Sequence, residues 1–313
     1  MRNLLVVVHC LLAGLVAGCA HVATSPSQAP RDLKLTLSHD GEWLVARWGE
    51  GDVQARLVLL DGTRVAASHD LTLPDGTESV AFSQVPGELL VALAVKGEGG
   101  ELRRVASATG VYEVLYAGPT VPRHLTALAD GSVVFLVPAA PASQTGRWMR
   151  AHDGKTVPLQ SGTDTSRVPV MPIDGQLLRL DPYMPPRFTA VVGRVPQDLP
   201  GLSVPGTFWL HCADRQPRAC LRIALVATDD GRYLSRLSVL QGRQACAVPG
   251  RWWSRDESIS RNGRTVVFQS SADGNGGPLA LHVIRPAAGR CEPVEIPWAD
   301  VVNRSAGSAG RRG

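Results

Sequence analysis

Short apolar stretches separated by turn signals run through most of the chain. The clearest examples are residues 57–60, 89–95, 133–137, 221–227 and 265–268. Each is rich in valine or leucine and is closed by glycine, Asp-Gly or proline, whereas helical periodicity is scarce. This pattern is typical of many short β-strands joined by tight turns, and it predicts an all-β fold.

A glycine turn placed before an apolar strand recurs at regular spacing. Four clear copies are separated by 90, 44 and 88 residues, and their glycines are Gly41, Gly131, Gly175 and Gly263. The spacing indicates a repeating unit of about 44 residues. Pro86-Gly87 falls near one missing position, and the segment between Cys212 and Cys220 falls near the other.

A second turn follows each first turn. Its copies are Asp61-Gly62, Thr109-Gly110, Asp153-Gly154, Gln241-Gly242 and Ala288-Gly289. Two hairpin turns per unit imply about four strands per unit, which is the organisation of a propeller blade. We therefore expect a β-propeller of six four-stranded blades over residues 33–302. Seven blades and a pair of β-sandwiches are the alternatives.

The repeat resembles that of a known family. Residues 260–268 and 37–46 are similar to the WD40-like repeats of the TolB C-terminal propeller, which read roughly Ser-Pro-Asp-Gly before an aliphatic strand. His39 and Arg261 replace the proline, and Asn262 replaces the aspartate of the last copy. The resemblance implies the architecture and assigns no functional residue. Because a short tether stands where TolB has its N-terminal domain, we expect a protein other than TolB.

The N-terminus resembles a bacterial lipoprotein leader. A short basic start and an apolar run of about a dozen residues precede Leu15-Val16-Ala17-Gly18-Cys19, which matches a lipobox. A membrane-spanning helix needs about 20 apolar residues. We expect residues 1–18 to be a signal peptide, Cys19 to be lipidated, residues 19–32 to form a tether and residues 303–313 a flexible tail. Ala20 favours the periplasmic face of the outer membrane.

Export places the remaining cysteines in an oxidising compartment. Cys212, Cys220, Cys246 and Cys291 allow three pairings. We favour Cys212 with Cys220 across a turn, and Cys246 with Cys291 between the last two repeats. No CxxC or HxxxH spacing supports a metal site, and we expect no cofactor.

Composition and motifs exclude some functions. The net charge is +4, and no basic stripe interleaved with aromatic residues is present, so we expect no binding to nucleic acid. The sequence has no Gly-x-Ser-x-Gly elbow and no glycine-rich phosphate loop, and its eight histidines are scattered. We therefore identify no catalytic residue.

Trp252-Trp253, followed by Arg255, is the most suggestive local feature. Tryptophan and arginine are enriched in binding hot spots. We take these three residues as a candidate binding site, with burial of both rings between two blades as the alternative. The sequence favours a non-catalytic binding or scaffold lipoprotein of the cell envelope, with a protein or glycan partner. A propeller enzyme acting on glycans and a structural envelope protein are the alternatives.

Overall fold

The structure is a computed structural model. It describes residues 29–30, 32–49, 53–97, 99–143, 145–159, 164–165, 170–173, 176–181, 187–192, 207–213, 219–241, 244–271, 279–287 and 289–303. The predicted leader, Cys19 and most of the predicted tether and tail lie outside these residues.

The described residues form six antiparallel sheets in chain order. The first contains β1 (Lys34–Leu37), β2 (Trp43–Trp48), β3 (Gln54–Asp61) and β4 (Arg64–Asp70). The second contains β5 (Thr77–Phe82), β6 (Glu88–Val95), β7 (Gly99–Ala106) and β8 (Tyr112–Gly118). The third contains β9 (Arg123–Ala127), β10 (Val133–Pro138), β11 (Thr145–His152), β12 (Lys155–Pro158) and the short β13 (Asp164–Thr165).

The remaining three sheets complete the set. The fourth has three described strands, β14 (Val170–Ile173), β15 (Gln176–Asp181) and β16 (Arg187–Val192). The fifth contains β17 (Thr207–Cys212), β18 (Ala219–Ala227), β19 (Tyr233–Gln241) and β20 (Gln244–Ala247). The sixth contains β21 (Trp253–Ile259), β22 (Val266–Ser271), β23 (Leu279–Ile284) and β24 (Val294–Ile296), and the helix α2 (Trp298–Asn303) follows it.

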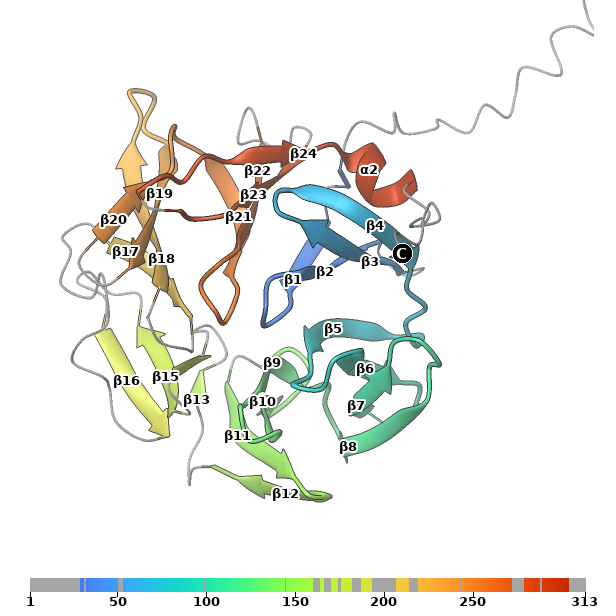
Figure 1. Cartoon of the computed structure of the whole chain (residues 1–313). Coiled ribbons are helices and arrows are strands. Elements are labelled where there is room, and N and C mark those ends of the chain that lie inside the picture. Colours follow the sequence, from blue (N-terminus) through green and yellow to red (C-terminus); the bar gives the residue numbers. More distant parts are fainter. Residues whose placement is uncertain are drawn as a thin grey trace, which may run out of the picture.

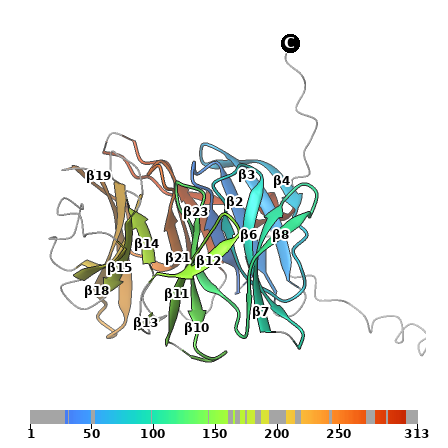
Figure 2. The same ribbon diagram turned by 90° about the horizontal axis from the view of Figure 1, so that it is seen from below.

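The sheets stand around a common axis (Figures 1 and 2). The first strand of each sheet contacts the first strand of the next, and β21 contacts β1, so the six inner strands form a closed ring. This arrangement is a β-propeller, which confirms the predicted fold class. Five of the sheets contain a run of four strands, and the described part of the fourth contains three.

The alternating strand directions define two faces of the ring. Because each sheet is an antiparallel meander, the turns between first and second strands all lie on one face, which we call the turn face. The connections between sheets lie on the opposite face. Ala29, which pairs with Leu279 of β23, and α2, which packs against β3 and β4, also lie there. We call it the terminal face.

Side-chain hydrogen bonds hold the turn that recurs in the sequence. In the first sheet, Ser38 Oγ donates to Asp40 Oδ1 (2.6 Å), and the N–H of Glu42 donates to the same oxygen (2.9 Å). Ser38 Oγ in turn accepts from the N–H of Trp43 (2.8 Å). Gly41 has a φ of 77°, which favours glycine. The serine, the aspartate and the glycine of the repeat therefore each have a structural task in the turn.

The sixth sheet repeats this design with asparagine. Ser260 Oγ donates to Asn262 Oδ1 (2.7 Å), which also accepts from the N–H of Arg264 (3.0 Å), and Ser260 Oγ accepts from the N–H of Thr265 (3.0 Å). This turn also supports the first one, since Asn262 Nδ2 donates to the carbonyl of Asp40 (2.7 Å). Asparagine therefore replaces aspartate without loss of the turn geometry.

Apolar packing joins the last sheet to the first. One buried cluster includes Leu44 and Val58 of the first sheet and Val267 and Leu281 of the sixth. Trp298 of α2 belongs to the same cluster and stands edge-on to Trp48 at 5.0 Å between ring centroids. The described strands of the two sheets are not shared, and apolar burial closes the ring together with the Ala29–Leu279 pair and the hydrogen bond from Asn262 to Asp40.

Two disulfides lie in the last third of the chain. Cys212 and Cys220, at the ends of β17 and β18, are directly opposite each other, and they are bonded. Cys246 of β20 is bonded to Cys291, which precedes β24, so this disulfide joins the fifth and sixth sheets. This is the pairing that the cysteine spacing favoured.

Candidate functional site

A hollow with a mainly apolar lining lies on the turn face, between the first and second sheets. Its volume is about 600 Å³. Its principal lining residues are Asp40, Trp43, Leu57, Phe82, Val85, Glu88 and Leu89. We call this hollow the turn-face groove.

The apolar side chains of the groove come from both sheets. Trp43 begins β2 and Leu57 lies in β3, whereas Phe82 ends β5 and Leu89 lies in β6. Leu89 belongs to the buried cluster between the two sheets, and Leu57 and Phe82 pack against that cluster. The groove is thus the open end of a well-packed seam, which gives it a preformed floor.

Val85 forms a ridge at the edge of the groove. It lies in the turn between β5 and β6, and 50% of its surface is exposed. A single exposed apolar side chain is common on protein surfaces, but Val85 adjoins the other apolar side chains of the groove. Ser83 Oγ fixes the turn by accepting from the N–H of Val85 (3.4 Å) and by donating to the carboxylate of Glu88 (3.3 Å).

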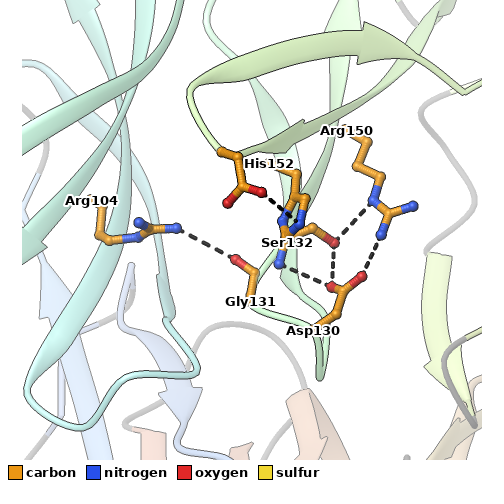
Figure 3. A network of polar contacts seen from close by, with 7 residues as sticks. Arg104, Asp130, Gly131, Ser132, Arg150 and His152 are labelled. Atoms are coloured by element: carbon orange, nitrogen blue, oxygen red, sulfur yellow. Dashed lines mark hydrogen bonds and ion pairs between the residues drawn. The ribbon is translucent and has the colours of Figure 1, made fainter.

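A second, more polar hollow of about 440 Å³ lies on the other side of this ridge, between the second and third sheets. Asp130 organises one part of it (Figure 3). Its Oδ1 accepts from Ser132 Oγ (2.6 Å), and its Oδ2 accepts from Arg150. Burial would raise the pKa of Asp130, but the hydrogen bonds from Ser132 and the charge of Arg150 outweigh burial and lower it.

Arg104 connects the two hollows. Its guanidinium donates to the carbonyl of Gly131 (3.4 Å), pairs with Glu113 (3.1 Å) and lies 3.7 Å from Glu88 (Figure 3 shows the first of these). In the polar hollow, His152 Nε2 also lies 3.3 Å from Asp153 Oδ2. The polar hollow therefore carries both signs of charge.

A different group of polar side chains meets at the axis of the propeller. Inner strands surround a channel cavity of about 420 Å³, which is lined by His124, His211, Asp256 and Glu257 among others. In β9, His124 and Leu125 are both opposite one residue of β10, and Asp256 and Glu257 occupy the equivalent bulge in β21. His124 (φ 53°) and Asp256 (φ 46°) have left-handed backbones, so the bulges direct these side chains differently from a regular strand.

Buried polar groups hold the acidic part of the channel. Asp256 Oδ2 accepts from Nε2 of the fully buried Gln269 (3.0 Å), which also donates to the carbonyl of Leu33 (2.9 Å). Lys34 Nζ lies 3.5 Å from Asp256 Oδ1. Across the channel, burial lowers the pKa of His211 to about 4, so the imidazole is neutral at neutral pH.

Arg261 covers the channel on the turn face. It lies in the turn between β21 and β22, and its Nη1 donates to the carbonyl of Ala127 at the end of β9 (2.6 Å). Gln84 Nε2 of the second sheet donates to the same carbonyl (3.3 Å). Burial lowers the pKa of Arg261 to about 10, which leaves the guanidinium charged at neutral pH.

Trp252 of the sequence-predicted site packs in the seam between the fifth and sixth sheets. Its ring lies 5.3 Å from that of Phe268 and 5.0 Å from that of His282. Its backbone exchanges two hydrogen bonds with Ser235 (2.7 and 2.9 Å). These contacts agree with the alternative in which the ring fills the seam.

The other two residues of that predicted site have different surroundings. The guanidinium of Arg232 lies 5.0 Å from the ring centre of Trp253, which is a cation–π distance. Arg255 is exposed on β21. The structure therefore gives Trp252 and Trp253 packing partners and leaves Arg255 at the surface.

No group of three or more histidine, cysteine, aspartate or glutamate side chains within the described ranges is arranged to hold a metal ion. No helix in that part of the chain is long and apolar enough to cross a membrane.

Solved structures of other proteins have a fold similar to that of this chain. The chain is similar to TolB from Acinetobacter baumannii, with a TM-score of 0.51 and 12% identity over 81% of this chain and 60% of that one. The chain folds as a TolB-like β-propeller. The low identity is compatible with a protein other than TolB, as expected from the sequence.

Two further structures have similar propellers. One is an acylaminoacyl peptidase, with a TM-score of 0.50 and 13% identity over 84% of this chain and 44% of that one. The other is the β-propeller domain of the Trilobed protease from Pyrococcus furiosus, with a TM-score of 0.49 and 9% identity over 84% and 83% of the two chains. The likeness to the peptidase shows the fold alone. No protein-family model and no curated protein matches the chain.

Reasoning from sequence missed the turn-face groove. The sequence pattern assigns Trp43 and Pro86-Gly87 to the repeat, and it does not assign them to a binding site. The groove has no local signature because it forms between side chains of two sheets and the turn at Asn262 of a third. The sequence signal for the groove is an apolar residue inside a predicted turn, as Val85 is beside Pro86-Gly87.

Proposed function

We propose that this chain is an exported lipoprotein, anchored through a lipid on Cys19, whose propeller binds an envelope protein and catalyses no reaction. The observation that carries the proposal is the turn-face groove, an apolar hollow edged by the exposed Val85. Aromatic and aliphatic side chains in a preformed hollow are typical of the anchoring part of an interface.

The positions of the chain ends support this role. Ala29 joins the propeller at the terminal face, ten residues after Cys19. A segment of that length spans at most about 35 Å. A lipid on Cys19 would therefore hold the terminal face toward the bilayer and direct the turn face away from it. The periplasmic face of the outer membrane is the location that we propose.

An enzyme acting on envelope or extracellular glycans is the second candidate function, because His124, His211, Asp256 and Glu257 meet at the channel. A general base works best with a pKa near the working pH, and His211, with a pKa of about 4, is a weak proton acceptor at neutral pH. Binding is therefore the better-supported function. Glycan turnover by the purified protein, lost in His211→Gln, would favour the enzyme.

The binding function is tested by crosslinking and co-purification of the lipidated protein from cells. Val85→Asp places a charge in the groove, and we expect it to reduce recovery of the partner at least tenfold. Val157→Asp is the matched control, since Val157 has 51% exposure and lies on β12 outside both hollows. Equal recovery of the same partner with all three proteins would exclude the groove as the binding site.

The anchor is tested separately by Cys19→Ala. Without the thiol no lipid can be attached, so we expect the protein to leave the membrane fraction. Fractionation of cells followed by immunoblotting measures this shift. A variant that stays in the membrane fraction would contradict lipid anchoring through Cys19.

A further inference from the structure

Charge at the turn-face groove indicates what kind of polypeptide it takes. Among its described lining residues are two carboxylates, Asp40 on the first sheet and Glu88 on the second, and no lysine or arginine. They stand on the two sides of the apolar floor. A partner that inserts an apolar side chain would therefore bring its neighbouring residues close to negative charge.

Arg104 does not cancel this charge. It lies 3.7 Å from Glu88, but it also pairs with Glu113 at 3.1 Å. One guanidinium thus faces two carboxylates.

Arg285, which follows β23 of the sixth sheet, is likewise surrounded by carboxylates, and it contacts two turns of the first sheet. Its side chain donates to the carbonyls of Gly41 (3.2 Å) and Gly62 (2.9 Å). Three carboxylates interact with it electrostatically, and they are Glu42, Asp40 and Asp61. Arg104 and Arg285 therefore each have more than one carboxylate nearby.

The shape of the surface favours an extended ligand. The apolar groove and the polar hollow share the turn residues Ser83, Gln84 and Val85, so they are continuous across the Val85 ridge. A small cationic ligand would fill only one of the two hollows. An extended polypeptide can place successive side chains in both hollows.

We infer that the turn-face groove binds a polypeptide segment of its partner in which apolar residues adjoin basic residues. This inference rests on the proposed binding function and specifies the partner's chemistry. The partner's apolar side chains contact the groove floor at Trp43, Leu57 and Phe82. The partner's basic side chains lie beside Asp40 and Glu88.

Charge-neutral variants test the inference without disturbing the turn. Asp40→Asn should preserve the first turn, because Asn262 makes the equivalent hydrogen bonds in the sixth sheet. Glu88→Gln retains an acceptor for Ser83 Oγ. Asp70→Asn/Glu292→Gln removes two exposed carboxylates away from the groove and serves as the matched control.

The probe is a fluorescein-labelled decapeptide of alternating leucine and lysine, titrated into the full chain and followed by fluorescence anisotropy. Peptides of alternating leucine and glutamate and of alternating serine and lysine are the comparisons. We expect Asp40→Asn/Glu88→Gln to weaken binding of the Leu/Lys peptide about tenfold, and added salt to weaken it as well. The control variant should leave the affinity unchanged.

Two results separate this inference from the proposed function. If the Leu/Glu or Ser/Lys peptide binds as well as the Leu/Lys peptide, or the charge-neutral variant binds it unchanged, the inference is wrong. Loss of the cellular partner in Val85→Asp would in that case still support the groove as a binding site. If Val85→Asp retains the partner, both proposals fail.

Discussion

At the scale of single residues, Gly41 is the position where the first turn tolerates least change. Its φ is 77°, and a Cβ there would lie 2.7 Å from Thr265 Cβ and 2.9 Å from Ser260 Cβ. We expect Gly41→Ala to lower the free energy of unfolding by about 2–4 kcal/mol, from backbone strain and the clash together. Urea unfolding of the full chain measures this loss.

Gly62→Ala is the matched control for that variant. Gly62 also has a positive φ, of 61°, but nothing lies within 4 Å of the position of an added Cβ. Only the backbone term of about 1 kcal/mol should remain. Equal losses in the two variants would show that the contact with the sixth sheet does not constrain the first turn.

His211, half-buried at the channel, should make stability depend on pH. Its pKa is lowered from 6.5 to about 4, so between these values the unfolded chain binds more protons than the folded one. Stability from this group is present above about pH 6.5 and decreases as the pH falls, by about 2 kcal/mol at pH 5. Burial also lowers the pKa of His282, so this group likewise contributes a loss of stability as the pH falls.

Urea unfolding between pH 7 and pH 5 tests this effect. His211→Gln should reduce the loss of stability on acidification, and replacement of the exposed His69 serves as the control variant. An identical pH dependence in wild type and His211→Gln would mean that this imidazole is as protonated in the folded chain as in the unfolded one.

At the scale of elements, the two disulfides should differ in their contribution. Cys246–Cys291 joins two sheets and closes a loop of 45 residues, whereas Cys212–Cys220 closes one of 8 within a sheet. Loop entropy in the unfolded chain predicts losses of about 4 and about 2.5 kcal/mol for the paired Cys→Ala variants. Denaturant unfolding compares them, and a larger loss for the 8-residue loop would contradict the entropic account.

The strands were predictable from the sequence, but their bulges were not. Each apolar run identified by pattern lies mainly within a strand, as residues 89–95 do in β6, because alternation and turn chemistry act locally. The bulges at His124 and Asp256 put ordinary residues into left-handed backbones. Histidine and aspartate adopt this conformation more readily than most residues, but that preference does not locate a bulge, which the surrounding sheet imposes.

At the scale of the whole molecule, the sequence indicated a ring but not how the ring closes or which residues line the groove. Closure depends on Ala29, Leu33 and Trp298, which lie at the two ends of the described chain and meet in one cluster. The groove likewise combines Trp43, Phe82 and Asn262 from three sheets. A repeat period fixes the number of units, whereas side-chain contacts between units follow from the folded geometry.

The turn face, and not the terminal face, is the surface that we propose binds the partner. The most direct test of this proposal is site-specific photo-crosslinking in cells, with a photoreactive amino acid at Val85 or at Tyr233. Tyr233, 60% exposed, begins β19 near the terminal face. We predict one specific adduct from position 85 and none from position 233. A specific adduct from position 233 alone would contradict this account.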